Sequence, residues 1–267
     1  MRLLAALVGV LFAGAAFAQS PPQTSAPRAI VMEVPSGRVL FEKNADAPTA
    51  PASLAKLMTV EIVLDRIEAG ALKPQSTFPV SAEAAKAKSG AFIPLRAGAA
   101  VSVDDLLQAL IVQSANNAAI VVAEGVAGSV PAFVDLMNRR AREIGLGDVR
   151  FANPNGVPGG EQRVTMRAMA ALGAHLVRTY SEHYARFGQP SFTFAGQAYR
   201  NRNPLLDAGI GADGLKTGQT QAAGFALVAS AEQNGRRLVL AMNGLASEAE
   251  RKAEALKLIA YGFSTPR

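Results

Sequence analysis

The sequence of 267 residues contains no cysteine, no tryptophan and only two histidines. Without cysteine it has no disulfide framework, no thiol nucleophile and no thiolate ligand for a metal, and no lipid can be attached to a cysteine at a cleavage site. Nothing beside His175 or His183 completes a catalytic triad or a metal site, so we interpret both as ordinary helix residues. A nucleophile and its base must therefore come from other residue types.

Charge is also sparse, because charged residues make up 18% of the sequence and hydrophobic residues 49%. This balance is typical of a globular protein and excludes disorder along most of the chain. The net charge is +6, but Lys and Arg form no long run. We therefore expect no nucleic-acid partner and at most a mild attraction to an anionic surface.

An apolar run stands at the N-terminus, over Leu3–Phe12, after the positive start Met1-Arg2. Ala16-Phe17-Ala18 then forms an A-x-A cleavage pattern. These features predict a signal peptide over residues 1–18, followed by a flexible, Pro-rich leader over residues 19–27. A membrane anchor is the alternative, but the run is short for a membrane span.

The rest of the chain combines strand-like runs at both ends with a helical middle. Two β-rich runs flank Pro35-Ser36-Gly37, and a second hairpin is expected around Asn234-Gly235. Helical spacing dominates residues 70–187, and Glu248–Ala260 is amphipathic. We predict an α/β (α+β) fold: an antiparallel sheet of N- and C-terminal strands, flanked by helices, with a helical subdomain inserted at about residues 70–187.

Three local predictions are useful for comparison with the structure. We expect one continuous helix over Val164–Phe187, because apolar residues recur there at helical spacing. A hairpin is expected to pair Phe92–Leu95 with Ala99–Val101. Only a short strand is expected over Gly214–Gly218.

The sharpest functional signal is Pro51-Ala-Ser-Leu-Ala-Lys-Leu-Met-Thr59. A helix that begins at Ser53 and runs to about Ala69 places Ser53 and Lys56 on one face, one turn apart. A hydroxyl within reach of an amine is a nucleophile with its own base. Taken alone, the pair is equally compatible with a helix-capping serine and a solvated lysine.

Ser114-Ala-Asn116 adds groups that could serve the same reaction. Ser114 can pass a proton to a leaving amine, and the Asn116 amide can orient Lys56 and a substrate carbonyl. Taken alone, this fragment indicates a helix break with caps.

Lys216-Thr217-Gly218 is the third fragment, and alone it indicates a strand end. Lys216 and Thr217 can hold a substrate carboxylate, and Gly218 lets a second backbone approach closely. A second lysine near a buried Lys56 would lower its pKa and make it a base. The three fragments in this order predict one site.

This combination resembles the serine penicillin-binding enzymes, and more closely the low-molecular-mass D-alanyl-D-alanine carboxypeptidases of the S11 type, over about residues 28–262. The residues that carry the resemblance are Pro51–Thr59, Ser114–Ala118, Phe151–Gly156, Asn201–Asn203 with Leu205-Leu206, and Asp213–Thr220. Ala55 and Asn117 depart from the family's usual Thr and Asp, but neither is a motif residue. The resemblance implies a single β-lactamase/transpeptidase-like catalytic domain over residues 28–267.

It also implies a serine acyl-transfer cycle on a peptidoglycan stem peptide that ends in D-Ala-D-Ala. Ser53 would attack the carbonyl between the two D-alanines, Lys56 would take its proton, and Ser114 would protonate the departing D-alanine. β-Lactam antibiotics would acylate Ser53 by the same route. No metal or cofactor is implied.

The resemblance implies a substrate-binding set as well. The backbone N–H groups of Ser53 and Gln219 would form an oxyanion hole, and Lys216 and Thr217 would hold the terminal carboxylate. Arg202 matches a family arginine, without a role that the sequence assigns.

Three other functions remain open at this point. A DD-endopeptidase that cuts peptidoglycan cross-links would use the same site. A class A-like β-lactamase would need a glutamate soon after the Ser-x-Asn motif, but Arg150–Asn155 has no acid and the next is Glu161. A non-catalytic peptidoglycan-binding module is the third.

The C-terminus bears on location. Many relatives continue into a small β-rich domain and an amphipathic anchor helix, whereas this sequence stops at Arg267. We therefore expect an exported, soluble periplasmic enzyme with no C-terminal anchoring domain and no stable membrane anchor.

Overall fold

The computed structural model describes residues 20–267, so the expected signal peptide over residues 1–18 lies outside the described residues. Five antiparallel strands form the main sheet: β1 (Arg28–Val34), β2 (Val39–Lys43), β7 (Ala212–Thr220), β8 (Gly224–Gln233) and β9 (Arg236–Leu245). Their order is β2-β1-β9-β8-β7, so the first strands pair with the last. The predicted sheet of N- and C-terminal strands is thereby confirmed.

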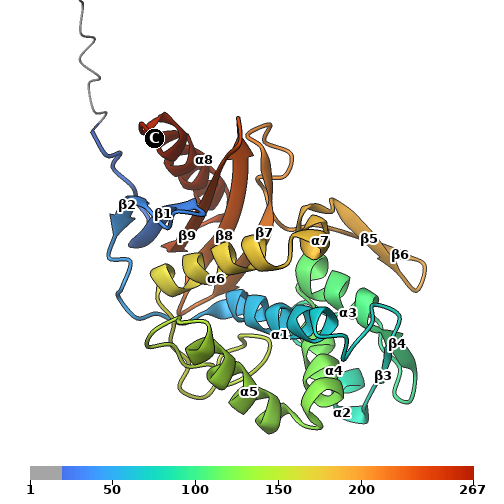
Figure 1. Cartoon of the computed structure of the whole chain (residues 1–267). Helices are drawn as coiled ribbons and strands as arrows, with labels where there is room; N and C mark the ends of the chain where they lie inside the picture. Colours follow the sequence, from blue (N-terminus) through green and yellow to red (C-terminus); the bar gives the residue numbers. More distant parts are fainter. Residues whose placement is uncertain (1–19) are drawn as a thin grey trace, which may run out of the picture.

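Both faces of this sheet are covered by helices (Figure 1). α6 (Met166–Thr179) packs on one face with Ile30 and Val239, and α8 (Glu248–Ser264) packs on the other with Val31 and Leu240. Neighbouring strand residues point to opposite faces, which explains why β8 and β9 are apolar almost throughout rather than alternating. Asn234 and Gly235 both have positive φ, as a tight hairpin between these strands requires.

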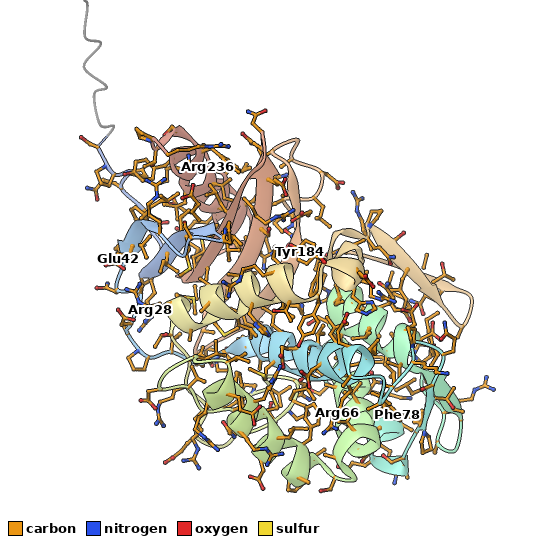
Figure 2. All side chains as sticks on the ribbon, in the orientation of Figure 1. Arg28, Glu42, Arg66, Phe78, Tyr184 and Arg236 are labelled. Atoms are coloured by element: carbon orange, nitrogen blue, oxygen red, sulfur yellow. The ribbon has the colours of Figure 1, made fainter. Side chains whose placement is uncertain are left out.

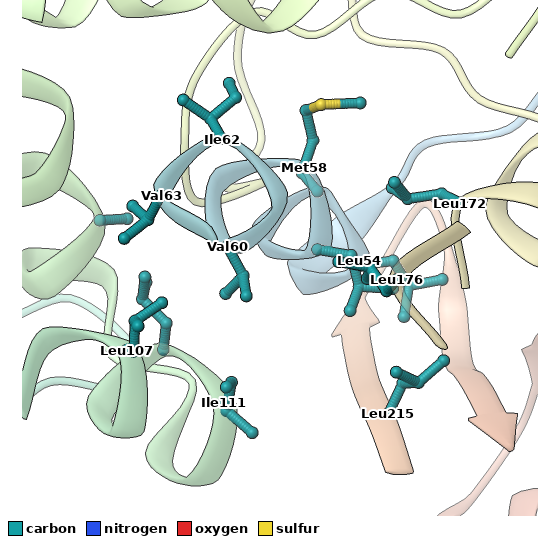
Figure 3. Packing of buried hydrophobic residues seen from close by; sticks show 14 of the residues in the cluster. Leu54, Met58, Val60, Ile62, Val63, Leu107, Ile111, Leu172, Leu176 and Leu215 are labelled. Carbon is teal, nitrogen blue, oxygen red and sulfur yellow. The ribbon is translucent and has the colours of Figure 1, made fainter. Parts of the chain in front are cut away.

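The helical part of the molecule surrounds α1 (Lys56–Glu68), which follows a short 3-10 turn η1 (Ala52–Ala55) (Figure 1). Around it lie α2 (Ala82–Lys86), α3 (Val103–Gln108), the π-helical η2 (Ala109–Gln113), α4 (Asn116–Ala127) and α5 (Val130–Glu143). Leu54 packs in one buried cluster with Leu176 of α6 and Leu215 of β7, and Val63 and Leu107 of α3 belong to the same cluster (Figure 3). Residues 56–64 of α1 are all buried, so the first turns of this helix are fixed between the sheet and the helical part.

Two small antiparallel pairs complete the fold: β3 (Thr77–Pro79) with β4 (Ala100–Ser102), and β5 (Ser191–Phe194) with β6 (Gln197–Arg200). Phe78 of β3 lies in the helical part beside α4 (Figure 2). The hairpin predicted between residues 92–95 and 99–101 is wrong, because residues 100–102 pair with β3 and residues 92–95 form no strand.

The single helix predicted over residues 164–187 is also wrong. α6 ends at Thr179, and α7 (Ser181–Tyr184) and the 3-10 turn η3 (Ala185–Gly188) follow. The break lies at Tyr180, whose hydroxyl donates to Glu61 Oε1 of α1 at 2.9 Å. Tyr184, in the next segment, donates to Asp213 Oδ1 of β7 at 3.0 Å (Figure 2). Tertiary hydrogen bonds therefore override the local helical pattern.

Two segments lie differently from the expected domain plan. Within the expected leader, Ala26 is buried, and Thr24 Oγ1 donates to Glu254 Oε2 of α8 at 2.6 Å. α6 packs on the sheet rather than in the inserted helical part where we expected it.

Among the described residues no single helix is long and apolar enough to cross a membrane; α4 and α5 meet that test only as a pair bent by 83°.

One buried ion pair ties α1 to its neighbours. The Glu61 side chain is fully buried, and besides Tyr180 it contacts His175 Nε2 of α6 at 3.1 Å and Arg140 Nε of α5 at 3.0 Å. Burial acts to raise the pKa of Glu61, but the hydrogen bonds from His175 and Arg140 outweigh burial and hold that pKa below its usual value. The carboxylate is therefore ionised and depends on its partners.

We predict that Arg140→Met lowers the free energy of unfolding by about 3 kcal/mol, because it leaves a buried carboxylate without its cation. Arg142→Met, an exposed position on the same helix, is the control and should change it by less than about 0.5 kcal/mol. Urea unfolding of both variants measures the difference. Equal losses would show that Glu61 does not need Arg140.

Candidate active site

The three sequence fragments meet in one cleft of about 390 Å³. Its lining includes Ser53 of η1, Ser114 and Asn116 at the start of α4, and Thr217, Gly218 and Gln219 of β7. Lys56 and Lys216 lie buried beneath these residues. The structure therefore brings together every site residue that the sequence analysis singled out.

Ser53 does not cap a helix. It lies in η1, its side chain makes no capping hydrogen bond, and α1 begins at Lys56 rather than at Ser53. The preceding residue, Ala52, has a φ of 47°, a left-handed conformation that costs free energy outside glycine. The loop around Gly156 packs so tightly there that a Cβ on Gly156 would lie 1.7 Å from Ala52 O. The backbone that precedes Ser53 is thus held in a strained turn by a second segment.

Lys56 is fully buried, and its Nζ has three contacts. Asn116 Oδ1 lies at 2.8 Å, the backbone carbonyl oxygen of Asn155 at 2.6 Å, and Ser53 Oγ at 3.1 Å. The first two oxygens can only accept hydrogen bonds, whereas the hydroxyl can donate. A neutral amine has two N–H bonds and one lone pair. With both N–H bonds directed to Asn116 and Asn155, the lone pair is left for the Ser53 hydroxyl.

The electrostatic surroundings favour this neutral amine. Burial lowers the pKa of Lys56 well below its usual value, and the positive charges of Lys216 and Arg202 lower it further. Burial, followed by the charges of Arg202 and Arg251, lowers the pKa of Lys216 to about 7. The expectation that burial and a second lysine depress the pKa of Lys56 agrees with this arrangement, in which burial contributes most.

Ser114 and Asn116 flank the point where η2 gives way to α4. Ser114 is buried in a left-handed conformation, with φ 64°, and its hydroxyl has no hydrogen-bond partner among residues 20–267. The Asn116 amide donates from Nδ2 to Ser89 O at 2.9 Å, and its backbone N–H donates to Ala91 O at 2.7 Å. The segment 89–91 therefore fixes the amide so that Oδ1 faces Lys56.

β7 forms the opposite wall and is longer than the predicted short strand, spanning nine residues. It is the last strand of the sheet, so one of its edges is unpaired by the sheet. A Cβ on Gly218 would lie 3.2 Å from Ser53 N, which explains why glycine is needed where β7 passes η1. Lys216 Nζ donates to Thr217 O at 3.0 Å. An extended peptide could therefore run along β7 beside Ser53.

Arginines give the cleft a positive charge. Arg202 is exposed at its edge, with Nη2 3.5 Å from Gln113 Oε1. Arg251 reaches in from α8 and is 4% exposed; its Nε is sealed in protein without a partner, and its ion pair with Glu248 Oε1 is long, at 3.8 Å. Because a buried cation is destabilised when no acid lies close to it, an anionic ligand in the cleft would stabilise Arg251.

The sequence analysis missed two of these residues. Arg251 stands on the face of α8 that carries Ala255 and Leu258 into the core, and a basic residue at that spacing was a usable signal. The Asn155 carbonyl gave none, because backbone groups are invisible in a residue pattern. No group of three or more acidic or histidine side chains in the described part of the chain is arranged to hold a metal ion.

Comparison with known proteins agrees with this geometry. The profile of the peptidase S11 family, described as D-alanyl-D-alanine carboxypeptidase, matches residues 15–245. The D-alanyl-D-alanine carboxypeptidase DacA of Haemophilus influenzae is 36% identical over 93% of this chain and 64% of its own length. DacC of Escherichia coli K12 is 38% identical over 95% of this chain and 66% of its own length. The chain thus spans slightly less than two thirds of these relatives.

Solved structures share the fold. Penicillin-binding protein 5 of Haemophilus influenzae superposes with a TM-score of 0.89 at 35% identity, over 92% of this chain and 73% of that one. Penicillin-binding protein 6B of Escherichia coli superposes with a TM-score of 0.88 at 34% identity, over 93% of this chain and 80% of that one. The sequence profile covers all three fragments of the cleft, and the chain belongs to the peptidase S11 family of D-alanyl-D-alanine carboxypeptidases.

Proposed function

We propose that the protein is a serine D-alanyl-D-alanine carboxypeptidase that removes the terminal D-alanine from peptidoglycan stem peptides. The observation that carries this proposal is the buried Lys56 amine, 3.1 Å from Ser53 Oγ, with two acceptors on its other side. A serine with a preoriented neutral base is equipped for acyl transfer. The relatives named D-alanyl-D-alanine carboxypeptidase support the same substrate class.

In the first step, Ser53 Oγ attacks the carbonyl carbon of the penultimate D-alanine while its proton moves to Lys56. Negative charge develops on the carbonyl oxygen, and the backbone N–H groups of Ser53 and Gln219 stabilise it. The C–N bond then breaks, and the departing amine takes a proton from Ser114. The Ser114 hydroxyl lines the cleft and has no hydrogen-bond partner in residues 20–267, so it is free to donate that proton, and the proton held by Lys56 then restores the hydroxyl.

In the second step, water attacks the acyl-enzyme. Lys56 is neutral again after the first step and can accept the proton of the attacking water. As the ester bond to Ser53 breaks, Lys56 returns that proton to Ser53 Oγ, and the shortened peptide leaves as a carboxylic acid that loses its own proton to solvent. Ser53 and Lys56 are thereby restored to their starting states without any further group.

The positive end of the cleft selects the substrate terminus. Thr217, Arg251 and Arg202 line the cleft with Ser53, and the buried Lys216 Nζ donates to the backbone oxygen of Thr217. A free carboxylate on the last D-alanine supplies the anion that these cations lack. This arrangement favours an exopeptidase, which cuts next to a free terminal carboxylate, over an endopeptidase, which cuts a peptide bond inside a longer chain.

β-Lactams are the second proposed class of ligand, as covalent inhibitors on Ser53. Penicillin-binding protein D2 of Listeria monocytogenes, 29% identical over 92% of this chain with a TM-score of 0.80, has a structure in an ampicillin-bound form. Because a penicillin also presents a strained amide and a carboxylate, the oxyanion hole and the cations would hold it in the same way.

The closest rival is a DD-endopeptidase that cuts cross-links. A D-alanyl-D-alanine endopeptidase of Pseudomonas aeruginosa is 28% identical over 85% of this chain and 76% of its own length. Both activities would use Ser53 and Lys56, so analysis of products from cross-linked and uncross-linked muropeptides separates them. A class A-like β-lactamase is disfavoured because the loop at 151–156 carries no acid.

We also propose that the chain is exported and acts on the cell wall in the periplasm, as one catalytic domain over residues 28–267. The N-terminal pattern of a positive start, an apolar run and Ala16-Phe17-Ala18 supports export. A substrate in the cell wall requires the same location.

We predict that a fluorescent penicillin labels the protein covalently and that Ser53→Ala abolishes labelling while leaving thermal unfolding unchanged. Ser36→Ala, in the exposed turn between β1 and β2, is the control and should be labelled like the wild type. Gel fluorescence measures the adduct. Equal labelling of Ser53→Ala would remove Ser53 from the mechanism, and no labelling of the wild type would favour a non-catalytic binding module.

We predict that Arg202→Gln moves the ascending limb of the pH profile of kcat/KM to higher pH. The positive charge of Arg202 lowers the pKa of Lys56, so its removal raises that pKa and delays formation of the neutral base. Arg200→Gln, an exposed arginine paired with Asp207, should leave the profile unmoved. The measurement uses a tripeptide that ends in D-Ala-D-Ala; a shift to lower pH would contradict the assignment of Lys56 as base.

We predict that Arg251→Gln lowers kcat/KM on the same tripeptide by roughly a hundredfold, because one partner of a desolvated charge pair is lost. On the tripeptide with an amidated C-terminus the wild type and the variant should differ by less than about threefold. The difference between the two substrates isolates the carboxylate from any general loss of fold. An equal loss on both substrates would give Arg251 a structural role only.

A further inference from the structure

A second and larger cavity, of about 830 Å³, lies among α2, α4 and the start of α5 (Figure 1). Its remaining wall is the loop at residues 153–157. The same loop continues into the wall of the catalytic cleft, which Gly156, Val157 and Pro158 line. The two hollows are therefore neighbours that share one loop.

Asn155 belongs to both sides of this wall. Its backbone carbonyl oxygen accepts from Lys56 Nζ at 2.6 Å, and the residue is among those that line the second cavity but not among those that line the catalytic cleft. Asn155 is 7% exposed, and its Oδ1 accepts from Val157 N at 3.3 Å. Its Nδ2 has no hydrogen-bond acceptor among residues 20–267, and this atom is not completely enclosed by protein. A ligand with an acceptor oxygen can therefore reach the Nδ2 donor of this largely buried side chain.

The rest of the lining restricts what that ligand can be. Apolar side chains are frequent in it, among them Ile120, Val130 and Pro154. The two charged residues of the lining, Glu83 and Glu124, are both acidic. Ser81 Oγ donates to Glu124 Oε1 at 3.1 Å, so one carboxylate is held at the cavity by a neutral partner. The lining therefore accepts a carbonyl oxygen and an apolar group but repels an anion, the reverse of the catalytic cleft.

We propose that this cavity binds a small uncharged amide with an apolar side chain, of the size of a short peptide unit, and that Asn155 couples its binding to Lys56. The carbonyl of the ligand accepts from Asn155 Nδ2, and its apolar group lies against Val130 and Pro154. The binding site stands on its own, whereas the coupling rests on the proposed role of Lys56 as base.

The coupling follows from the contacts of the shared loop. Thr59 Oγ1 of α1 donates to Pro154 O at 2.6 Å, and Asn153 Oδ1 accepts from Gly156 N at 2.7 Å. These bonds hold the Asn155 carbonyl against the amine. A ligand on the other side of the loop changes the position of that carbonyl. The carbonyl is one of the two acceptors of Lys56 Nζ, so its movement also changes how the Lys56 lone pair is directed toward Ser53.

Binding is tested with N-acetylphenylalaninamide and, as its matched anion, N-acetylphenylalanine. We expect the amide to bind with a dissociation constant on the order of 1 mM and to shift the backbone amide NMR signals of Gly125 and Gly128, which line the cavity. The signals of Gly90 and Gly218, in the cleft, should move less. The anion should leave Gly125 and Gly128 unmoved. No saturable shift at these two glycines, or an equal response to the anion, would overturn the proposal.

Two variants locate the site independently. Asn155→Leu removes the donor at similar volume and should weaken binding of the amide roughly tenfold. Val130→Phe fills the cavity and should abolish binding, with thermal unfolding as the check on its fold. Unchanged affinity in both folded variants would place the ligand elsewhere.

Coupling is measured as the rate at which a fluorescent penicillin acylates Ser53 with and without saturating N-acetylphenylalaninamide. We expect the rate to change by roughly threefold or more, because the orientation of the base is altered. An unchanged rate in a protein that binds the amide would overturn the coupling. Failure of penicillin to react at all would instead refute the proposed function and leave the NMR result standing.

Discussion

The structure is organised around an amine that is buried without an acid. Lys56 has no carboxylate partner among residues 20–267, and burial lowers its pKa well below the usual value, so its charged form is destabilised. Asn116 and Asn155 satisfy its two N–H bonds from different segments. The helix break before α4 brings Asn116 Oδ1 to Lys56 Nζ, and the loop at 153–157 brings the Asn155 carbonyl oxygen to the same nitrogen. Both irregular segments are therefore part of how the amine is held.

Much of this arrangement could be predicted from the sequence. The alternation of strand runs and helical spacing predicted a sheet with strands from both chain ends, and the Asn234-Gly235 turn located its longest hairpin. Ser53, Lys56, Ser114 and Lys216 could be expected to lie together because their residue types suit one reaction. Such predictions are possible where a side chain carries the information.

The remainder depends on groups that a residue pattern does not describe. The Asn155 carbonyl is a backbone atom, and the Tyr180 break exists because a hydroxyl reaches Glu61 from a distant helix. His175, which we interpreted as an ordinary helix residue, contacts that same buried Glu61 carboxylate through Nε2. The strands β3 and β4 pair in register from Thr77↔Ser102 to Pro79↔Ala100, with residues 80–99 between them, whereas local spacing favoured a nearer partner.

The order β2-β1-β9-β8-β7 also has a consequence for how the chain folds. β1 lies in the interior of the sheet, yet one of its two neighbours, β9, pairs Asn243 with Arg28 at the opposite end of the chain. Such a pairing closes a very long loop, which slows folding relative to local contacts. During synthesis β1 has only its hairpin partner until β9 is made, so the five-stranded sheet, and the turn that carries Ser53 against β7, can assemble only after β9 has emerged.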